Sequence, residues 1–365
     1  MSELRLMKGN EALAEAAIRA GVDAYYGYPI TPQSEVMEYL MKANPIASTG
    51  MVVLQAESEV ASINMVYGAA GAGKMAMTSS SSPGVSLMQE GISYIAGAEL
   101  PCVVVNVVRG GPGLGTIQPS QADYFQTVKG GGHGDYKLIT LAPASVQEMA
   151  DFMKLAFDLA FKYRNPAMIL SDGAIGQMME KVELFDPIPR RTDEEVAQQC
   201  PWATTGRKRG TQKRVITSLR LVASVQEEFN IKLQKKYQEI QEKEVRAELI
   251  NCDDAEYVIV AYGSSARTSM KTVEMARKDG LKVGLLRPQT LWPFPSKQIE
   301  NLIEKGAKGF LSVEMSAGQM IEDIRLAVNG KAEAAHYGRM GGVIASPADI
   351  YQALKMYVKQ WNSKI

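Results

Sequence analysis

The sequence has very little histidine or cysteine. Only His133 and His336 occur among 365 residues, which leaves little scope for a Ser-His-Asp hydrolase or a metal site built from several histidines. The three cysteines, Cys102, Cys200 and Cys252, are far apart and form no CxxC pair. Neither a disulfide framework nor a zinc or iron–sulfur site is therefore expected, and we predict no metal ligands in this chain.

Net charge and long apolar runs are also missing. Lys+Arg and Asp+Glu both number 40, so no net field attracts nucleic acid or an anionic membrane. No apolar run approaches the roughly 18 residues of a membrane span. The opening segment, MSELRLMKGN, lacks the basic-then-apolar build of a signal peptide. These absences predict a cytoplasmic protein that binds neither nucleic acid nor a membrane.

The chain is long and apolar enough to form more than one domain. Of its 365 residues 46% are apolar, which favours two or three cores. Up to about residue 190, short β-branched or aromatic runs alternate with helical patterns, as in a parallel α/β sheet covered on both faces. Residues 191–252 are charge-dense and largely helical, and a second, smaller α/β series follows. We predict an α/β protein with domains 1–190 and 253–365, joined by the connector 191–252.

Polar residues follow four predicted strands of the first domain. Thr31 follows the first, Glu57 and Glu59 the second, the segment 78–84 (TSSSSPG) the third, and Arg109 the fourth. Because ligands bind at the carboxyl ends of parallel strands, these residues should meet at one edge of the sheet. Hydroxyls, two carboxylates and a guanidinium suit a small anionic substrate.

Each of these residues also has a possible structural role. Thr31 could cap a helix that has Pro32 at its first position, and Ser79 to Ser82 could cap the helix that follows them. Arg109 could pair with a helix carboxylate, and the glutamates could be solvated residues at a helix start. Their combination at one edge nevertheless favours a functional site.

Two glycine-rich segments match known nucleotide-binding loops only in part. Residues 68–74 (GAAGAGK) have the spacing of a phosphate loop, but Met75 stands where Ser or Thr is needed. We interpret these glycines as allowing close packing of a helix on its sheet. Residues 110–115 (GGPGLG) do not spell the dinucleotide fingerprint GxGxxG. His133 lies in GGGHGD and is predicted to be a solvated turn residue.

Several motifs together resemble the alpha subunits of 2-oxoacid:ferredoxin oxidoreductases. The motifs are YPITP (28–32), ESE (57–59), the serine run 78–84, Arg109 with GGPG, LRPQTLWPFP (286–295) and GRMGG (338–342). The resemblance therefore covers essentially the whole chain. The segment RGGPGLGTIQPSQADYFQ is most similar to the 2-oxoisovalerate (3-methyl-2-oxobutanoate) branch, with the 2-oxoglutarate branch next.

The resemblance implies a pyrimidine-binding domain for thiamine diphosphate, followed by a transketolase C-terminal-like domain. It implies that Glu59 is the catalytic carboxylate and that Thr31 and Arg109 bind the substrate. The choice of Glu59 over Glu57 stays open. The residues that it places around the cofactor are Pro29, Ile30, Glu59, Ser81 and Ser82.

The implied reaction is the oxidative decarboxylation of a 2-oxoacid to acyl-CoA and carbon dioxide, with reduction of ferredoxin. A beta subunit would share thiamine diphosphate and hold its diphosphate and Mg²⁺, because residues 171–173 (SDG) only approach the usual GDG pattern. Gamma and ferredoxin-like delta subunits would complete a hetero-oligomer, with iron–sulfur clusters on partner subunits. The alternatives are a 2-oxoglutarate enzyme and a non-catalytic assembly subunit.

Overall fold

A seven-stranded sheet forms the centre of the first domain in the computed structural model, which describes residues 3–206 and 212–363. Most of its strands run parallel, and the central ones are buried on both faces, which explains their nearly continuous apolar sequences. The strand order is β12 (Thr290–Trp292), β6 (Ile139–Leu141), β7 (Pro166–Asp172), β5 (Cys102–Val108), β4 (Ala76–Ser80), β2 (Ala24–Gly27) and β3 (Val52–Gln55).

Helices cover both faces of this sheet, as the sequence predicted. One group that packs together contains α1 (Gly9–Arg19), α2 (Ser34–Ala43), α6 (Val146–Tyr163) and α7 (Gly173–Gln177). The other contains α4 (Glu59–Gly71) and α5 (Ser82–Gly97). Shorter elements are α3 (Pro45–Ser48), the π-helical turn η1 (Gln126–Gly130) and a two-stranded sheet of β1 (Glu3–Lys8) and β8 (Met179–Leu184). The first helix begins at Gly9, directly after β1, which was not predicted.

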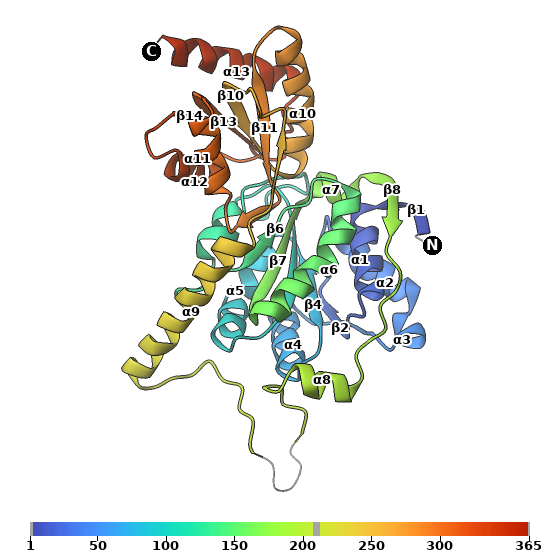
Figure 1. Ribbon diagram of the computed structural model, residues 1–365. Coiled ribbons are helices and arrows are strands. Elements are labelled where there is room, and N and C mark those ends of the chain that lie inside the picture. Colours follow the sequence, from blue (N-terminus) through green and yellow to red (C-terminus); the bar gives the residue numbers. More distant parts are fainter. Residues whose placement is uncertain (1–2, 207–211, 364–365) are drawn as a thin grey trace.

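The connector contains α8 (Asp193–Gln199) and the long helix α9 (Ala223–Lys243). Figure 1 shows α9 beside the first domain. Only one stripe of α9 is buried, formed by Phe229, Leu233, Tyr237 and Ile240, so most of its surface is charged. Strand β9 (Ala247–Ile250) falls inside the predicted connector but pairs with the second sheet. The predicted boundary between the connector and the second domain, after residue 252, stays a prediction.

The second domain is a smaller α/β unit. Its sheet has the order β14 (Glu333–Gly338), β13 (Gly309–Glu314), β10 (Tyr257–Val260), β11 (Val283–Pro288) and β9. Helix α10 (Gly263–Lys278) packs on α13 (Pro347–Asn362), and α11 (Ser296–Glu304) packs on α12 (Met320–Val328). Across residues 3–206 and 212–363, no helix is both long and apolar enough to cross a membrane.

The two domains are joined by buried polar contacts and by a shared sheet. Strand β12 comes from the second half of the chain and pairs antiparallel with β6 of the first sheet. The side chain of Gln121 donates to the carbonyl of Tyr262 at 2.8 Å, and Ser264 Oγ donates to Asp172 at 2.6 Å. Burial raises the pKa of the Asp172 carboxyl. The second domain thus sits over the edge where the parallel strands of the first sheet end (Figure 1).

Candidate active site

The four polar segments predicted to form a site do meet at one edge of the first sheet. Strands β3, β2, β4 and β5 are parallel neighbours in that order. Their carboxyl ends lead into Glu59, Thr31, the serine run and Arg109, respectively. The parallel topology thus brings together residues that are as much as 78 positions apart in the chain.

Glu59 is buried at the first position of α4. Its exposed fraction is 7%, whereas Glu57 is exposed. A Cβ added to Gly84 would lie 2.6 Å from Glu59 Oε1 and closer still to Ser80 Oγ, so the carboxylate lies against the first turn of α5. No residue of the described chain donates a hydrogen bond to this carboxylate. A buried carboxylate is costly unless it is bonded, so its position is suited to a ligand.

The serine run provides hydroxyls without protein partners. Thr78 to Ser81 are fully buried. Ser79 Oγ donates to Gln33 Oε1 at 2.6 Å, whereas Ser80 Oγ and Ser81 Oγ have no partner among the described residues. Ser81 occupies the N-cap position of α5 but its side chain makes no capping bond. The capping role considered for these hydroxyls is therefore wrong for Ser81, and both free hydroxyls can serve a ligand.

Arg109 links two of the segments. It is 9% exposed, and its Nη1 donates to the carbonyl oxygen of Thr31 at 2.9 Å. Its backbone N–H donates to Ser82 Oγ at 3.2 Å. Its Nε has no partner, and no carboxylate of the described residues forms an ion pair with it. The expected alternative, a structural ion pair, is thus not observed, and the guanidinium can bind an anion.

The loop that carries Thr31 does not form a helix start. Helix α2 begins at Ser34 with Gln33 as its N-cap, so the role of Thr31 as a helix cap is wrong. Thr31 and Pro29 are exposed at the edge of the sheet, and Ile30 is half-buried. These three residues are therefore accessible from the same side as Arg109.

Sequence reasoning missed the residues that hold these segments in place. The side chains of Asn10 and Gln177 both donate to the carbonyl oxygen of Pro32, at 2.8 and 2.9 Å. Asn106 accepts from the backbone N–H of Ser82 at 3.1 Å and donates to Asp123, whose pKa is raised by burial. Asn106 had a visible signal, because it is the polar residue within the apolar run CVVVNVV.

The phosphate-loop-like segment lies at the opposite edge of the sheet and is covered. Gly68 and Gly71 belong to α4, and a Cβ on Gly73 would lie 2.9 Å from Ala203 Cβ. Lys74 pairs with Asp193 of the connector at 2.8 Å. This segment therefore has no room for a nucleotide. The close-packing interpretation is wrong for Gly68, which has no atom within 4 Å of an added Cβ.

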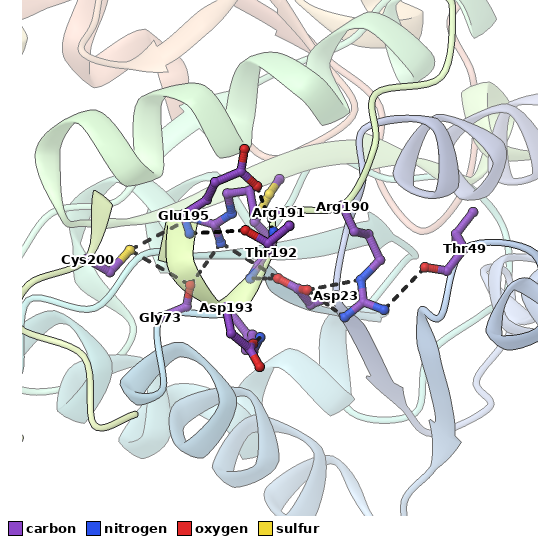
Figure 2. A network of polar contacts seen from close by, with 11 residues as sticks. Asp23, Thr49, Gly73, Arg190, Arg191, Thr192, Asp193, Glu195 and Cys200 are labelled. Carbon is purple, nitrogen blue, oxygen red and sulfur yellow. Dashed lines mark hydrogen bonds and ion pairs between the residues drawn. The ribbon is translucent and has the colours of Figure 1, made fainter. Parts of the chain in front are cut away.

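Figure 2 shows how the connector is fastened over that edge. Arg190 bonds Asp23 through two nitrogens, at 3.0 and 2.8 Å, and Arg191 donates to the carbonyl of Gly73 at 2.8 Å. The network lies at the amino ends of β2 and β4, whereas Glu59 and Arg109 follow the carboxyl ends of β3 and β5. Its role is to bind the connector to the first domain.

The SDG segment does not form a metal site. Asp172 caps α7 by accepting from the backbone N–H groups of Ala174 and Ile175, and it also accepts from Ser264. Within the two described ranges, no group of three or more His, Cys, Asp or Glu side chains is placed to hold a metal ion.

The loop after Arg109 packs against the closing motif of the second domain. Thr116 N donates to the carbonyl of Gly110 at 2.8 Å, and a Cβ on Gly110 would lie 3.2 Å from the carbonyl carbon of Gly341. Leu114 and Met340 remain exposed beside this contact. Both domains therefore contribute to the rim of the candidate site, which presents apolar side chains outward.

Comparison with known proteins agrees with this arrangement. Residues 15–248 match the family model described as "Pyruvate flavodoxin/ferredoxin oxidoreductase, thiamine diP-bdg". The chain belongs to the 2-oxoacid:ferredoxin oxidoreductase family. Residues 255–350 match the model of "Pyruvate:ferredoxin oxidoreductase core domain II". The chain is therefore a subunit of a thiamine-diphosphate-dependent oxidoreductase.

Relatives within this family cover nearly the full chain. Ketoisovalerate oxidoreductase subunit VorB of Methanothermobacter thermautotrophicus is 51% identical over 354 residues, which are 96% of this chain and 97% of the relative. 2-Oxoglutarate synthase subunit KorA of Methanocaldococcus jannaschii is 37% identical over 373 residues, 96% and 99% of the two chains.

Solved structures confirm the fold of this oxidoreductase subunit. The 2-oxoglutarate:ferredoxin oxidoreductase from Magnetococcus marinus is similar, with a TM-score of 0.83 and 29% identity. The similarity covers 97% of this chain and 65% of the Magnetococcus chain, which is longer. A split-gene transketolase, described as an inactive beta4 tetramer, has a TM-score of 0.61 at 12% identity over 96% of this chain and 97% of that one. The second similarity concerns the fold alone.

Proposed function

We propose that this chain is the pyrimidine-binding alpha subunit of a 2-oxoisovalerate:ferredoxin oxidoreductase. The enzyme would convert 2-oxoisovalerate and coenzyme A to acyl-CoA and carbon dioxide, and would reduce ferredoxin. Support for the substrate comes from the ketoisovalerate relative at 51% identity, against 37% for the 2-oxoglutarate relative. The structural support is the buried, unpartnered carboxylate of Glu59 at the same edge as Arg109.

The residues present fit the aminopyrimidine side of thiamine diphosphate. Ser80 and Ser81 have buried hydroxyl oxygens without a protein partner, Glu59 is a buried residue, and Gly84 leaves the space beside Glu59 free of a side chain. The residues that would hold the cofactor are Pro29, Ile30, Glu59, Ser81 and Ser82. When bound, the cofactor supplies the electron sink that allows the carboxylate of a 2-oxoacid to leave.

The protein's own contribution is to position a proton and an anion. Glu59 would accept a hydrogen bond from a ring nitrogen of the cofactor and hold the proton there. Arg109 would bind the substrate carboxylate in a charge-assisted bond. Because Nη1 of Arg109 is bonded to the Thr31 carbonyl, the loop of Thr31 would lie beside the same carboxylate.

The remaining components would be supplied by partner subunits. We place the diphosphate and Mg²⁺ on a beta subunit, because the bonds of Asp172 to Ala174, Ile175 and Ser264 occupy the only carboxylate of the SDG segment. Gamma and ferredoxin-like delta subunits would carry the iron–sulfur clusters and complete the reaction with ferredoxin and coenzyme A. A cytoplasmic location is proposed from the sequence alone.

A matched pair of variants tests this function. In the reconstituted complex, viologen reduction should require both 2-oxoisovalerate and coenzyme A. Glu59→Gln should lower kcat by about a hundredfold or more, because a proton acceptor is lost. Glu57→Gln is the control, since Glu57 is exposed whereas Glu59 is buried, and it should stay within about twofold of wild type.

The possible outcomes separate the alternatives. Full activity of Glu59→Gln would remove the catalytic role of Glu59. Faster turnover of 2-oxoglutarate than of 2-oxoisovalerate would favour the 2-oxoglutarate enzyme. If variants of Glu59, Thr31 and Arg109 changed assembly but not the turnover of the assembled complex, the chain would be an assembly subunit.

A further inference from the structure

A small cavity lies between the connector and α5, far from the candidate active site. Its volume is about 150 Å³, and its walls come from α5, the loop 133–136, connector residues 218–220 and α9. A cavity of this size accommodates about six heavy atoms, because an engineered apolar cavity of roughly 150 Å³ binds benzene. We refer to it as the connector cavity.

The connector cavity contains an arginine without a counterion. The Arg220 guanidinium lies over the ring of Phe229, 3.4 Å from its centroid, and Nη1 donates to the Gly97 carbonyl at 3.3 Å. Across residues 3–206 and 212–363, no carboxylate forms an ion pair with Arg220, and Nε and Nη2 have no partner. Stacking on Phe229 fixes the plane of the guanidinium, so its free N–H groups are oriented before any ligand arrives.

His133 lies at the same cavity. Its ring packs edge-on against Tyr94, with centroids 5.9 Å apart, and its carbonyl accepts from Ser93 Oγ at 2.7 Å. The residue is exposed, as predicted for a solvated turn, but the Ser93 bond holds its loop against α5, and His133 is one of the residues that line the cavity. No described residue bonds its ring nitrogens. A further donor comes from Asn230, whose Oδ1 is already occupied by Gln226.

The rest of the lining sets the kind of anion that fits. The apolar side chains of Phe229 and Leu233 are also part of the cavity lining. One acidic residue, Asp135, also lines it, and its charge interacts with Lys137. A lining that combines hydrogen-bond donors with apolar side chains suits a carboxylate with a short hydrocarbon tail better than a fully polar anion.

We infer that the connector cavity binds a small organic carboxylate of about six heavy atoms, such as isobutyrate. The site is separate from the candidate active site, because α5 begins at Ser82 beside Arg109 and ends at Gly97 beside the cavity. Sixteen helical residues separate the two by about 24 Å. A bound carboxylate would bridge the connector and α5.

The test uses the full-length chain with Arg109→Met, so that the other candidate carboxylate ligand is absent. Isobutyrate binding is measured by saturation-transfer NMR, with inorganic phosphate as a second probe. The chain should bind one isobutyrate, and adding Arg220→Met should weaken binding at least tenfold. Arg214→Met is the matched control, because Arg214 is a connector arginine bonded to Ala203 and Thr205 and does not line the cavity.

A second variant distinguishes loss of the ligand contact from loss of the connector structure. Asn230→Asp keeps the side-chain shape and adds a negative charge to the lining, so it should also weaken isobutyrate binding at least tenfold. Unchanged affinity in both variants, or no binding to the Arg109→Met chain, would overturn the inference. Phosphate binding as tight as that of isobutyrate would overturn the class of ligand. None of these results depends on catalysis by the complex.

Discussion

Arg109 holds two segments of the candidate site together, since its side chain bonds Thr31 and its backbone bonds Ser82. Arg109→Met should raise the apparent KM for the 2-oxoacid at least about tenfold, because a buried charge partner is removed. Arg267→Met is a suitable control, as Arg267 pairs with Glu180 at 2.7 Å outside the site. Steady-state viologen reduction by the complex measures both, and an unchanged KM for Arg109→Met would make Arg109 structural.

The residues at the strand ends were predictable because parallel topology places them at one edge whatever the details of packing. The choice between Glu57 and Glu59 was not, since the two residues lie two positions apart at the start of the same helix and the structure separates them by burial. The bond from Asn106 to Asp123 also depends on contacts between distant segments. No spacing rule in the sequence reports such contacts.

Helices α4 and α5 offer a test at the scale of elements. Gly68 has free space around an added Cβ, so Gly68→Ala should stabilise the isolated chain by about 0.5–1 kcal/mol. Gly91 faces Ile63, and a Cβ there would lie 2.6 Å from Ile63 Cγ2. Gly91→Ala should therefore destabilise the chain by about 1–3 kcal/mol. Urea unfolding measures the free energy of unfolding of both variants. If both substitutions stabilised the chain, or both destabilised it, this account of the α4–α5 contact would be contradicted.

Helix α9 docks through a half-buried lysine. Burial lowers the pKa of Lys236 to about 8; Glu99 opposes this effect, and Lys232 and Arg164 add to it. Between about pH 8 and the unfolded value of about 10.4, the unfolded chain binds more protons than the folded one, so this lysine's contribution to stability rises with pH.

Lys236→Met should remove this pH dependence. Relative to wild type, the variant should lose about 1–3 kcal/mol of unfolding free energy between pH 7.5 and 10.5. Lys235→Met, at an exposed neighbouring position, is the control. Urea unfolding across this range measures the difference, and a difference that stays constant with pH would show that Lys236 is solvated.

Elements with a clear apolar or helical pattern were predictable, whereas strands without such a pattern were not. Strands β5 and β10 have clear apolar runs, and α9 has a clear helical stripe. Strands β1, β9 and β12 contain three to six residues each. Such segments become strands only because a partner strand is available, and that partner is distant in sequence.

At the scale of the whole molecule, Gln121 joins the two domains. Its side chain donates to Tyr262 and accepts from Ser265 Oγ and Met315 N, at 2.8, 2.7 and 2.9 Å. Gln121→Leu should cost about 2–4 kcal/mol, because buried partners are left unpaired. Gln238→Leu, on the exposed face of α9, should change stability by less than about 0.5 kcal/mol.

Calorimetry of the full chain measures this contribution. Wild type should unfold in one transition, because the domains share a sheet and a buried interface. Gln121→Leu should lower the midpoint of that transition. An unchanged midpoint would show that the junction contributes little. The existence of two α/β domains was predictable from the sequence. Their relative placement was not, since it depends on single contacts between distant segments.

The pairing of β12 with β6 also has a consequence for synthesis. The edge strand Ile139–Leu141 stays open until Thr290–Trp292, about 150 residues later, has emerged from the ribosome. At about 5–20 residues per second, this delay is about 7–30 s. During that time an unpaired strand edge is exposed to other nascent chains. A fragment that ends before Thr290 would keep this edge permanently open and should aggregate where the full chain does not.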